Sequence, residues 1–367
     1  MATPGGIEDL VRSIALRTIV RLTRTRPLRD PSELRRRASR VLFICEDAIG
    51  DIILSLPAMR AIAEGHPGNT VDLLTWDLAA QMVRGLPYIN DTIVFPRYDR
   101  SRIRAARVIR ERGPYDAVVD GMVLRSHVRT RSIAIMLASG AGALIGEAGR
   151  TNDHVFTIPI PRSSVDTRHD DRMLALAKPF LQPDARPSRR AWLIATDDEL
   201  RSAAERWRTV PGESPNVLIN LSASSNERRW PDHKFAIALD FLRGTLPDAR
   251  VLLVSLPADA PSARALADHV DGVSIIPTIR ELTALVATSD LIITPDTAVC
   301  HMASAFEKTL ISLNPKDREI WGPYDTPGKR VVGPTLVTLD GLEPDAVIDA
   351  IREVVGAELP RIRMAAV

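Results

Sequence analysis

The sequence predicts an α/β protein with two parallel, doubly wound sheets. Short apolar runs of strand length alternate with helical segments, first between residues 41 and 139 and again between residues 217 and 313. This alternation is typical of parallel sheets whose crossover helices cover both faces. A segment rich in proline and charge, residues 183–189, separates the two series in a chain of 367 residues, which is long enough for two domains. We therefore expect two Rossmann-like domains.

In the first series, Val41-Leu42-Phe43-Ile44 is an unbroken apolar run, as expected for a strand buried on both faces, and residues 52–64 follow it as a helix. The other expected strands are 71–74, 92–95 and 117–119, and the other expected helices are 79–84, 100–112 and 129–139.

The second series has the same alternation and is followed by a helix near the C-terminus. Its expected strands are 217–221, 251–255, 274–276, 291–293 and 310–313, with helices at 234–246, 262–269, 279–288 and after residue 296. We place an arm at 1–40, domains at 41–183 and 184–343, and a helix and tail at 344–367, whose helix we expect to pack back across the hinge. Ligands of such folds bind at the carboxyl ends of the strands, so we expect a cleft between the two domains.

The composition is that of a globular protein, with 45% hydrophobic and 26% charged residues. The chain has no apolar run of membrane-spanning length and no signal-peptide pattern, and it has only two cysteines, Cys45 and Cys300. A cytoplasmic location without a disulfide framework is therefore expected. Residues 1–40 hold ten arginines and four acids, a net charge of +6; the whole chain is +2, so the rest sums to −4. This near-neutral body argues against a nucleic-acid-binding protein.

Residues 1–40 have their own pattern, because apolar residues such as Ile7, Leu10 and Ile14 recur at helical spacing with arginines between them. A basic amphipathic helix can lie on an anionic membrane surface. The alternative is a helix that packs on the body of the protein with a solvated basic face.

Residues 289–306 are the most informative stretch, because an apolar run ends at Asp296 and Thr297 and a small-residue segment with His301 follows. Asp296 or Thr297 is suited to cap a helix, and the free N–H groups of a helix N-terminus favour an anion such as a phosphate. The stretch is therefore a candidate diphosphate site. The alternative is an ordinary strand–helix junction with a packed histidine.

Residues 45–54 hold a second candidate site just after the first strand. Asp51 follows Gly50 at the start of a helix, where its carboxylate could accept a proton from a substrate hydroxyl. The alternative role is a charge that favours the helix dipole. Glu46 and Asp47 lie beside it, and three acids would raise one another's pKa values if they converged. A divalent metal is conceivable there but is not expected.

Residues 220–231 also follow a strand and precede a helix. The small residues Ser222 and Ser224 leave backbone N–H groups open to a phosphate, and Arg228 and Arg229 offer forked donors. The alternative is a surface loop with two solvated arginines.

These segments together resemble glycosyltransferase family 9, the ADP-heptose:lipopolysaccharide heptosyltransferase family. AIGDIILSLPAMRAI at 48–62, SASSNERRWP at 222–231 and DTAVCHMASA at 296–305 are similar to its three motifs, in the same order. His169-Asp170-Asp171-Arg172 also resembles a family segment containing His and Arg, and the resemblance covers about residues 41–335.

The resemblance implies a GT-B fold, with an N-terminal acceptor-binding and a C-terminal nucleotide-sugar-binding domain, and inversion at the transferred sugar. It implies that Asp51 is the general base on the acceptor hydroxyl, and that Glu46, Asp47, Gly50 and His169 lie on the acceptor side. Its donor-side residues would be Ser222, Ser224, Arg228, Asp296, Thr297 and His301. No metal ion or other cofactor is implied.

The function expected on this basis is transfer of a heptose from an ADP-sugar to a lipopolysaccharide core or other glycan acceptor, at the inner face of the cytoplasmic membrane. Two departures leave alternatives open: Cys45 stands where the family usually has Lys or Arg, and Ala298 where it usually has Gly. The alternatives are a family 9 transferase with another nucleotide sugar or a soluble acceptor, and a non-catalytic protein that binds sugar nucleotides. A sugar epimerase of similar architecture is a weaker alternative.

Overall fold

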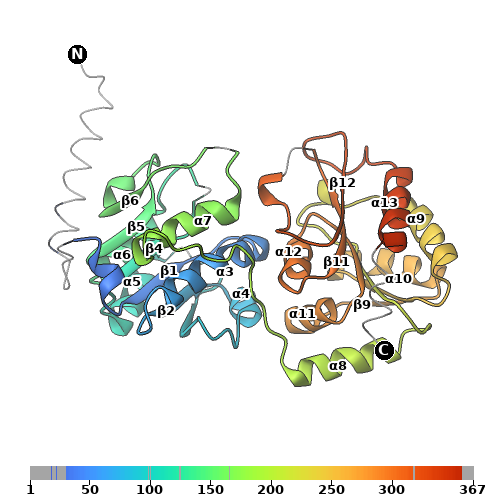
Figure 1. Cartoon of the computed structure of the whole chain (residues 1–367), viewed down its shortest axis with the longest axis horizontal. Coiled ribbons are helices and arrows are strands. Elements are labelled where there is room, and N and C mark those ends of the chain that lie inside the picture. Colours follow the sequence, from blue (N-terminus) through green and yellow to red (C-terminus); the bar gives the residue numbers. More distant parts are fainter. Residues whose placement is uncertain are drawn as a thin grey trace, which may run out of the picture. The chain divides into compact units, whose positions relative to one another are not determined.

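The computed structural model describes residues 30–97, 99, 101–123, 125–164, 166–316 and 319–357, together with Thr18 and Leu22. The helix expected within residues 1–40 falls almost wholly outside these residues. The chain divides into two compact units, unit 1 up to Arg189 and unit 2 from Arg190 (Figure 1). The division lies within a few residues of the linker expected from the sequence.

Unit 1 is built on a six-stranded sheet in which every neighbouring pair is parallel and the order is β3-β2-β1-β4-β5-β6. The strands are β1 (Arg40–Ile44), β2 (Thr70–Thr75), β3 (Asp91–Val94), β4 (Ala117–Asp120), β5 (Ala143–Glu147) and β6 (Ile158–Ile160). The register sets Val41 beside Val71 on one side and Ala117 on the other. This is the doubly wound order whose ligand crevice lies at the carboxyl ends of the two central strands.

Helices cover both faces of this sheet (Figure 1). They are α2 (Glu33–Arg36), α3 (Ile49–Glu64), α4 (Asp77–Met82), α5 (Arg102–Arg112), α6 (Thr130–Ala138) and α7 (His169–Ala177), with short 3₁₀ turns at Asp153–Val155 and Lys178–Phe180. α3 packs on α7, and α5 packs on α6. Ala105 and Ile109 of α5 join the same apolar core as Ile135 and Met136 of α6.

Unit 2 repeats this plan in a second parallel sheet, of order β12-β11-β10-β7-β8-β9. When β7 to β12 are counted as strands one to six and the sheet is read from β9, the order is the same as in unit 1. The strands are β7 (Asn216–Asn220), β8 (Arg250–Val254), β9 (Val273–Ile275), β10 (Leu291–Pro295), β11 (Thr309–Asn314) and β12 (Gly328–Val332). The helices are α8 (Asp197–Arg208), α9 (Asp232–Thr245), α10 (Ala260–His269), α11 (Ile279–Ala287), α12 (Ala298–Ala305) and α13 (Pro344–Ala357), with 3₁₀ turns at Asn226–Arg228, Pro257–Asp259 and Glu319–Trp321.

The structure confirms the α/β class and the two parallel sheets, and it adds elements that the sequence analysis missed. The missed elements are α2, β5, β6, α7, α8 and β12. β6 carries Pro159 and β12 begins at Gly328, and both are edge strands, where such residues are tolerated but weaken the apolar pattern. α8 did carry a signal, because Thr196 and Glu199 form a capping box at its start.

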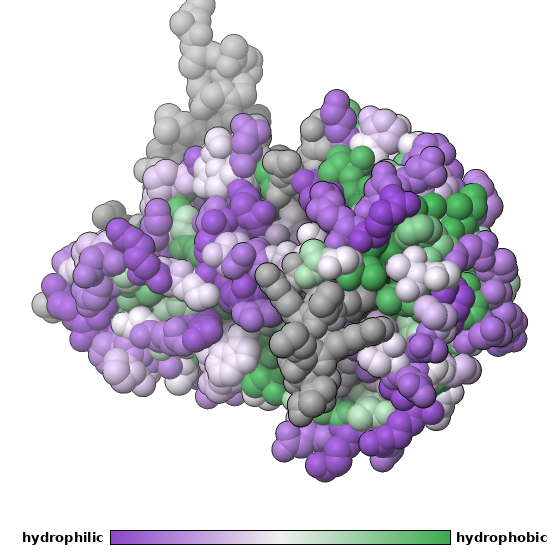
Figure 2. All heavy atoms as spheres, turned by 45° about the vertical axis from the view of Figure 1, so that its right-hand side comes forward, coloured by the Kyte–Doolittle hydropathy of each residue, from purple (hydrophilic) through white to green (hydrophobic). Residues whose placement is uncertain are grey.

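The C-terminal helix α13 belongs to unit 2. Its buried residues Val347, Ala350, Ile351 and Val354 join the core under α9 and the sheet. The packing of this helix across the hinge stays a prediction. In the part of the chain that the structure describes, we find no helix with the length and apolar character needed to cross a membrane. Hydrophilic side chains predominate on the face that Figure 2 shows, and apolar ones form smaller patches between them.

Candidate functional site

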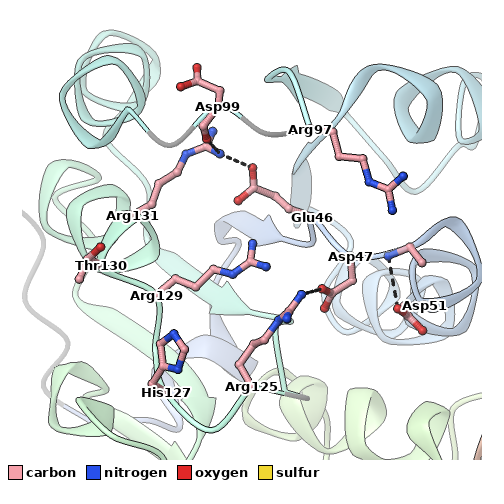
Figure 3. Close-up of a pocket in the computed structure, with 11 residues that line it drawn as sticks. Glu46, Asp47, Asp51, Arg97, Asp99, Arg125, His127, Arg129, Thr130 and Arg131 are labelled. Carbon is pink, nitrogen blue, oxygen red and sulfur yellow. Dashed lines mark hydrogen bonds and ion pairs between the residues drawn. The ribbon is translucent and has the colours of Figure 1, made fainter.

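In unit 1 the carboxyl end of β1 leads into a polar hollow of about 830 Å³. Glu46 and Asp47 follow the strand directly, and Asp51 lies in the first turn of α3. Arginines from the segments after β3 and β4 complete the walls (Figure 3). The lining residues are Glu46, Asp47, Ala48, Asp51, Arg97, Asp99, Arg125, His127, Arg129, Thr130 and Arg131. The position agrees with the crevice that this strand order predicts.

The three neighbouring carboxylates of this hollow do not converge on one point (Figure 3). Glu46 accepts a hydrogen bond of 2.7 Å from Nη1 of Arg131. Asp47 accepts one of 2.9 Å from Nη2 of Arg125. Asp51 turns to its own helix, where its Oδ2 lies 3.3 Å from the backbone N–H of Ala48. The condition for three mutually perturbed acids is therefore not met at one point, although the charge of Asp47 contributes to the raised pKa of Glu46.

The arginines of the hollow are held by aromatic and backbone groups as well as by the acids. The guanidinium of Arg131 lies 4.5 Å from the ring centre of Phe95 and donates to the carbonyl of Asp99 at 2.7 Å. The guanidinium of Arg97 lies 4.5 Å from the ring centre of Trp76. Stacking of this kind fixes the orientation of the two guanidiniums, and the hollow is lined by four arginines and four acids.

Glu46 is in a desolvated position, with its side chain 6% exposed. Burial raises the pKa of this carboxyl, and the charges of Arg131 and Arg129 oppose the shift. Arg129 itself forms no ion pair with the described residues, and its guanidinium points into the hollow (Figure 3). The hollow thus offers Arg129, which has no ion pair with the described residues, beside the carboxylates of Glu46 and Asp47. A guanidinium in this setting is suited to bind an anionic group of a ligand.

In unit 2 the two central strands bring the other predicted motifs together. β7 pairs with β10, with Val217 beside Leu291, so the segments that follow the two strands meet at the carboxyl edge of the sheet. Thr297 is the N-cap of α12, since its Oγ1 accepts from the N–H of Val299 at 3.3 Å. Asn220, the last residue of β7, donates to the same Oγ1 at 3.2 Å. Of the two predicted caps, the structure selects Thr297.

Asp296 instead forms an ion pair with Arg228. The guanidinium of Arg228 donates to Oδ2 of Asp296 at 2.6 Å and to its carbonyl at 2.7 Å, and it reaches Oγ of Ser224 at 3.0 Å. The side chain of Asp296 is 5% exposed and that of Arg228 is 22% exposed. The pair therefore holds a partly exposed guanidinium beside the N-terminus of α12, where both the N–H groups and the cation favour a phosphate.

Ser222 and Arg229 support the loop around this pair. The hydroxyl of Ser222 donates to Oδ2 of Asp259 at 2.5 Å and accepts from the N–H of Leu256 at 2.8 Å. Arg229 pairs with the same Asp259 at 3.1 Å and with Asp232. The Trp-Pro end of the motif is structural too, because the fully buried Trp230 donates to the carbonyl of Leu342 at 2.9 Å.

His301 lies one turn into α12 and is 6% exposed. Its neighbour Cys300 is completely buried, donates to the carbonyl of Pro295 at 3.3 Å, and has a pKa raised by burial to about 12. Ala298, where the resemblance led us to expect glycine, is the half-buried first residue of this helix.

A model of glycosyltransferase family 9 (heptosyltransferase) matches residues 122–335, more than half of the chain. The chain belongs to glycosyltransferase family 9. It is therefore a glycosyltransferase, as the motifs of the sequence predicted. The match includes both motifs of unit 2, whereas the first motif, residues 48–62, lies outside it. A comparison with curated proteins found no match.

Solved structures confirm the GT-B fold of the transferase. It is similar to a family 9 glycosyl transferase from Veillonella parvula, with a TM-score of 0.74 and 16% identity over 86% of this chain and 97% of the other. It is similar to ADP-heptose LPS heptosyltransferase II of E. coli, with a TM-score of 0.68 and 17% identity over 87% and 99% of the two chains. E. coli heptosyltransferase WaaC, solved with ADP, has a TM-score of 0.65 and 17% identity over 86% and 99%.

Cys45 of the transferase, at the position where the family usually has a cation, is 1% exposed at the end of β1 and lies 3.7 Å from Oγ of Ser55. Burial raises the pKa of its thiol far above the usual range. The cations of the hollow come instead from Arg97, Arg125, Arg129 and Arg131, none of which the motifs singled out. The signals in the sequence were their positions: Arg97 follows the expected strand 92–95, and Arg125, Arg129 and Arg131 are dense arginines a few residues after the expected strand 117–119.

His169 lies apart from the hollow. It is the first residue of α7, is 2% exposed, and is not among the lining residues. Arg172, one turn later, forms a 2.6 Å ion pair with Glu147 at the end of β5. In the described structure this pair ties α7 to the sheet, and Gly50 lies in the first turn of α3 beside Asp51. The assignment of His169 and Gly50 to the acceptor side stays a prediction.

Proposed function

We propose that the transferase moves a heptose from an ADP-sugar to a glycan acceptor of the lipopolysaccharide core type. The observation that carries this proposal is the pairing of Arg228 with Asp296 beside the capped N-terminus of α12. The family description names heptosyltransferases, and the similar E. coli WaaC was solved with ADP and with ADP-2-deoxy-2-fluoro heptose.

Unit 2 would bind the nucleotide diphosphate. The partly exposed guanidinium of Arg228 and the first N–H groups of α12, after Thr297, supply fixed positive charge where ADP acquires negative charge as it leaves. Asp296 holds Arg228 in place through an ion pair, so these donors need little rearrangement when the ligand binds. Ser224, bonded to the same guanidinium, and the buried His301 would complete the donor side.

Unit 1 would bind the acceptor in the hollow at the carboxyl end of β1. Arg129, together with the stacked Arg97, can pair with phosphate or carboxylate groups of such an acceptor. Glu46 and Asp47 hold Arg131 and Arg125 and would set the shape of this wall. Asp51 lies at the same wall and would act as the general base.

The proposed reaction balances without a metal or a cofactor. The acceptor hydroxyl oxygen attacks the anomeric carbon of the sugar, and its proton passes to the Asp51 carboxylate. The bond between the anomeric carbon and the diphosphate oxygen breaks, and ADP leaves with the bonding electrons. Attack on the side opposite to ADP inverts the anomeric configuration.

A second candidate within the family is a transferase for another nucleotide sugar or for a soluble acceptor. Cys45 favours it, because the buried thiol replaces the cation that the family usually has there. A non-catalytic protein that binds sugar nucleotides is the third candidate. The basic segment 1–40 would contact the inner membrane surface if the acceptor is a lipid.

A nucleotide panel separates these candidates. Calorimetry with ADP, UDP, GDP and ADP-heptose should give binding only with the adenine nucleotides, and a coupled assay of ADP release should show turnover when a core oligosaccharide is added. Preference for UDP or GDP would select the second candidate. Binding of ADP-heptose without ADP release in the presence of any tested acceptor would select the third.

A further inference from the structure

Helix α5 of unit 1 presents an unusually basic outer face. Ala105 and Ile109 point into the core, whereas Ile103, Arg107 and Arg110 are spaced at i, i+4 and i+7 and line the opposite, exposed stripe. The helix carries five arginines and one acid, Glu111, a net charge of +4. Ile103, in the middle of these charges, is 76% exposed.

Among the described residues of unit 1, ion pairs neutralise only part of this charge. Arg104 lies 3.4 Å from Asp99, and Arg112 pairs with Asp91. Within the described ranges, Arg102, Arg107 and Arg110 form no ion pair. Like charges spaced three or four residues apart destabilise a helix slightly, so the stripe is better suited to an anionic partner than to water.

Helix α8 of unit 2 shows that exposure alone does not produce this pattern. It has a similar length and an exposed face, but its four acids and three arginines sum to −1 and pair along and beside the helix. Surface helices of this mixed kind are simply solvated. α5 lacks such balance and adds an exposed isoleucine.

We propose that the outer face of α5 docks on an anionic membrane surface. Arg102, Arg107 and Arg110 would pair with lipid phosphates, and Ile103 would enter the boundary between headgroups and acyl chains. A nucleic acid would satisfy the arginines but would leave the isoleucine without an apolar environment. This surface is formed by residues other than 1–40 and belongs to the described part of unit 1.

The hollow and α5 are joined through a short segment. Ser101 caps α5 by accepting from the N–H of Arg104 at 3.2 Å, and Asp99, two residues earlier, lines the hollow and binds Arg131. A docked α5 would hold the hollow close to the headgroups. On the proposed function, this predicts an acceptor attached to lipid; the docking itself does not depend on that function.

Vesicle partitioning of the full-length chain tests the docking. Vesicles of phosphatidylethanolamine and phosphatidylglycerol are compared with phosphatidylcholine alone, for Arg107→Gln/Arg110→Gln and for a control of equal charge change, Arg208→Gln/Arg264→Gln, on exposed helices of unit 2. At about 1 kcal/mol per arginine, the α5 variant should partition roughly 10- to 30-fold less and the control should match the wild type. Ile103→Ser should also lose partitioning, unlike Ile237→Ser on α9, which is 47% exposed in the native chain.

Equal partitioning of the two double variants on anionic vesicles would overturn the proposal. Tighter binding of the wild type to a DNA duplex than to the vesicles, lost in the α5 variant, would overturn it in favour of a nucleic acid. Circular dichroism and thermal unfolding of each variant check folding. Since partitioning is measured without substrate, failure of the docking is distinguishable from failure of the proposed transferase reaction.

Discussion

The two units share one strand order, but different side chains lie at the carboxyl ends of their strands. In unit 2 the key side chains belong to two short segments, and Arg228, Asp296 and Thr297 are fixed by direct hydrogen bonds. In unit 1 the arginines come from separate segments after β3 and β4 and surround an open hollow of about 830 Å³. The structure thus contrasts a compact group of bonded side chains in unit 2 with an open hollow in unit 1; on the proposed function, the first would bind the nucleotide and the second the acceptor.

The largest expected effect comes from Asp51. If unit 1 supplies the base, Asp51→Asn should lower kcat by about 100- to 10,000-fold, because the amide cannot accept the proton. Asp77→Asn is the matched control, since Asp77 is an exposed acid in the first turn of α4. The measurement is ADP release in a coupled assay with both substrates. If Asp51→Asn turns over as fast as the control, Asp51 is not the general base.

The acid dependence of the two units should also differ. The Arg280 guanidinium lowers the pKa of Glu199 from 4.5 to about 2, so this pair stabilises unit 2 above pH 4.5 and loses that contribution as pH falls towards 2. By pH 3 more than half of this contribution should be lost, and its size is reduced because solvent screens this partly exposed pair. Glu46 in unit 1 has a raised pKa, so its protonation at low pH relieves the cost of burying a charged carboxylate.

Hydrogen exchange of α8 and α11 between pH 7 and pH 3 measures this effect. Glu199→Gln should exchange faster than the wild type at pH 7 and converge with it at low pH. A difference that is constant across the range would contradict the assigned cause. Glu205→Gln, an exposed acid on the same helix, is the control.

Arg129 tests whether the hollow binds the acceptor. Arg129→Gln should raise the KM for an anionic acceptor about tenfold, the size of one charge-assisted hydrogen bond, and leave the KM for the donor unchanged. Arg208→Gln, an exposed arginine of unit 2, should change neither constant. A rise in the KM for the donor instead would indicate that the nucleotide binds in unit 1, which contradicts this assignment.

The smallest expected effect concerns the cysteines, one in each unit. Cys45 and Cys300 are buried and their thiol pKa values are raised, so neither should react with a thiol reagent in the native protein at pH 8. Both should react after unfolding in guanidinium chloride. Rapid reaction of one thiol in the native state would show that its unit opens at that motif.

The sequence predicted those parts of the site that are local. Asp51 and Thr297 lie at helix starts just after apolar strands, and the spacing of residues alone predicts such strand–helix junctions. The pairing of Arg131 with Glu46, and the place of Arg97 in the same hollow, could not be predicted, because only the order β3-β2-β1-β4 brings the segments after those strands together. β5 and β6 were missed for a related reason, since Gly146 and Pro159 interrupt their apolar pattern.

The division of labour between the units is tested most directly by titrating ADP into the wild type, Arg228→Gln and Asp51→Asn in a calorimeter. The account predicts that Arg228→Gln weakens ADP binding by about 10- to 100-fold, because a charged hydrogen-bond donor to the diphosphate is lost. It predicts that Asp51→Asn binds ADP with the affinity of the wild type. Unchanged affinity for Arg228→Gln, with weakened affinity for Asp51→Asn, would contradict it.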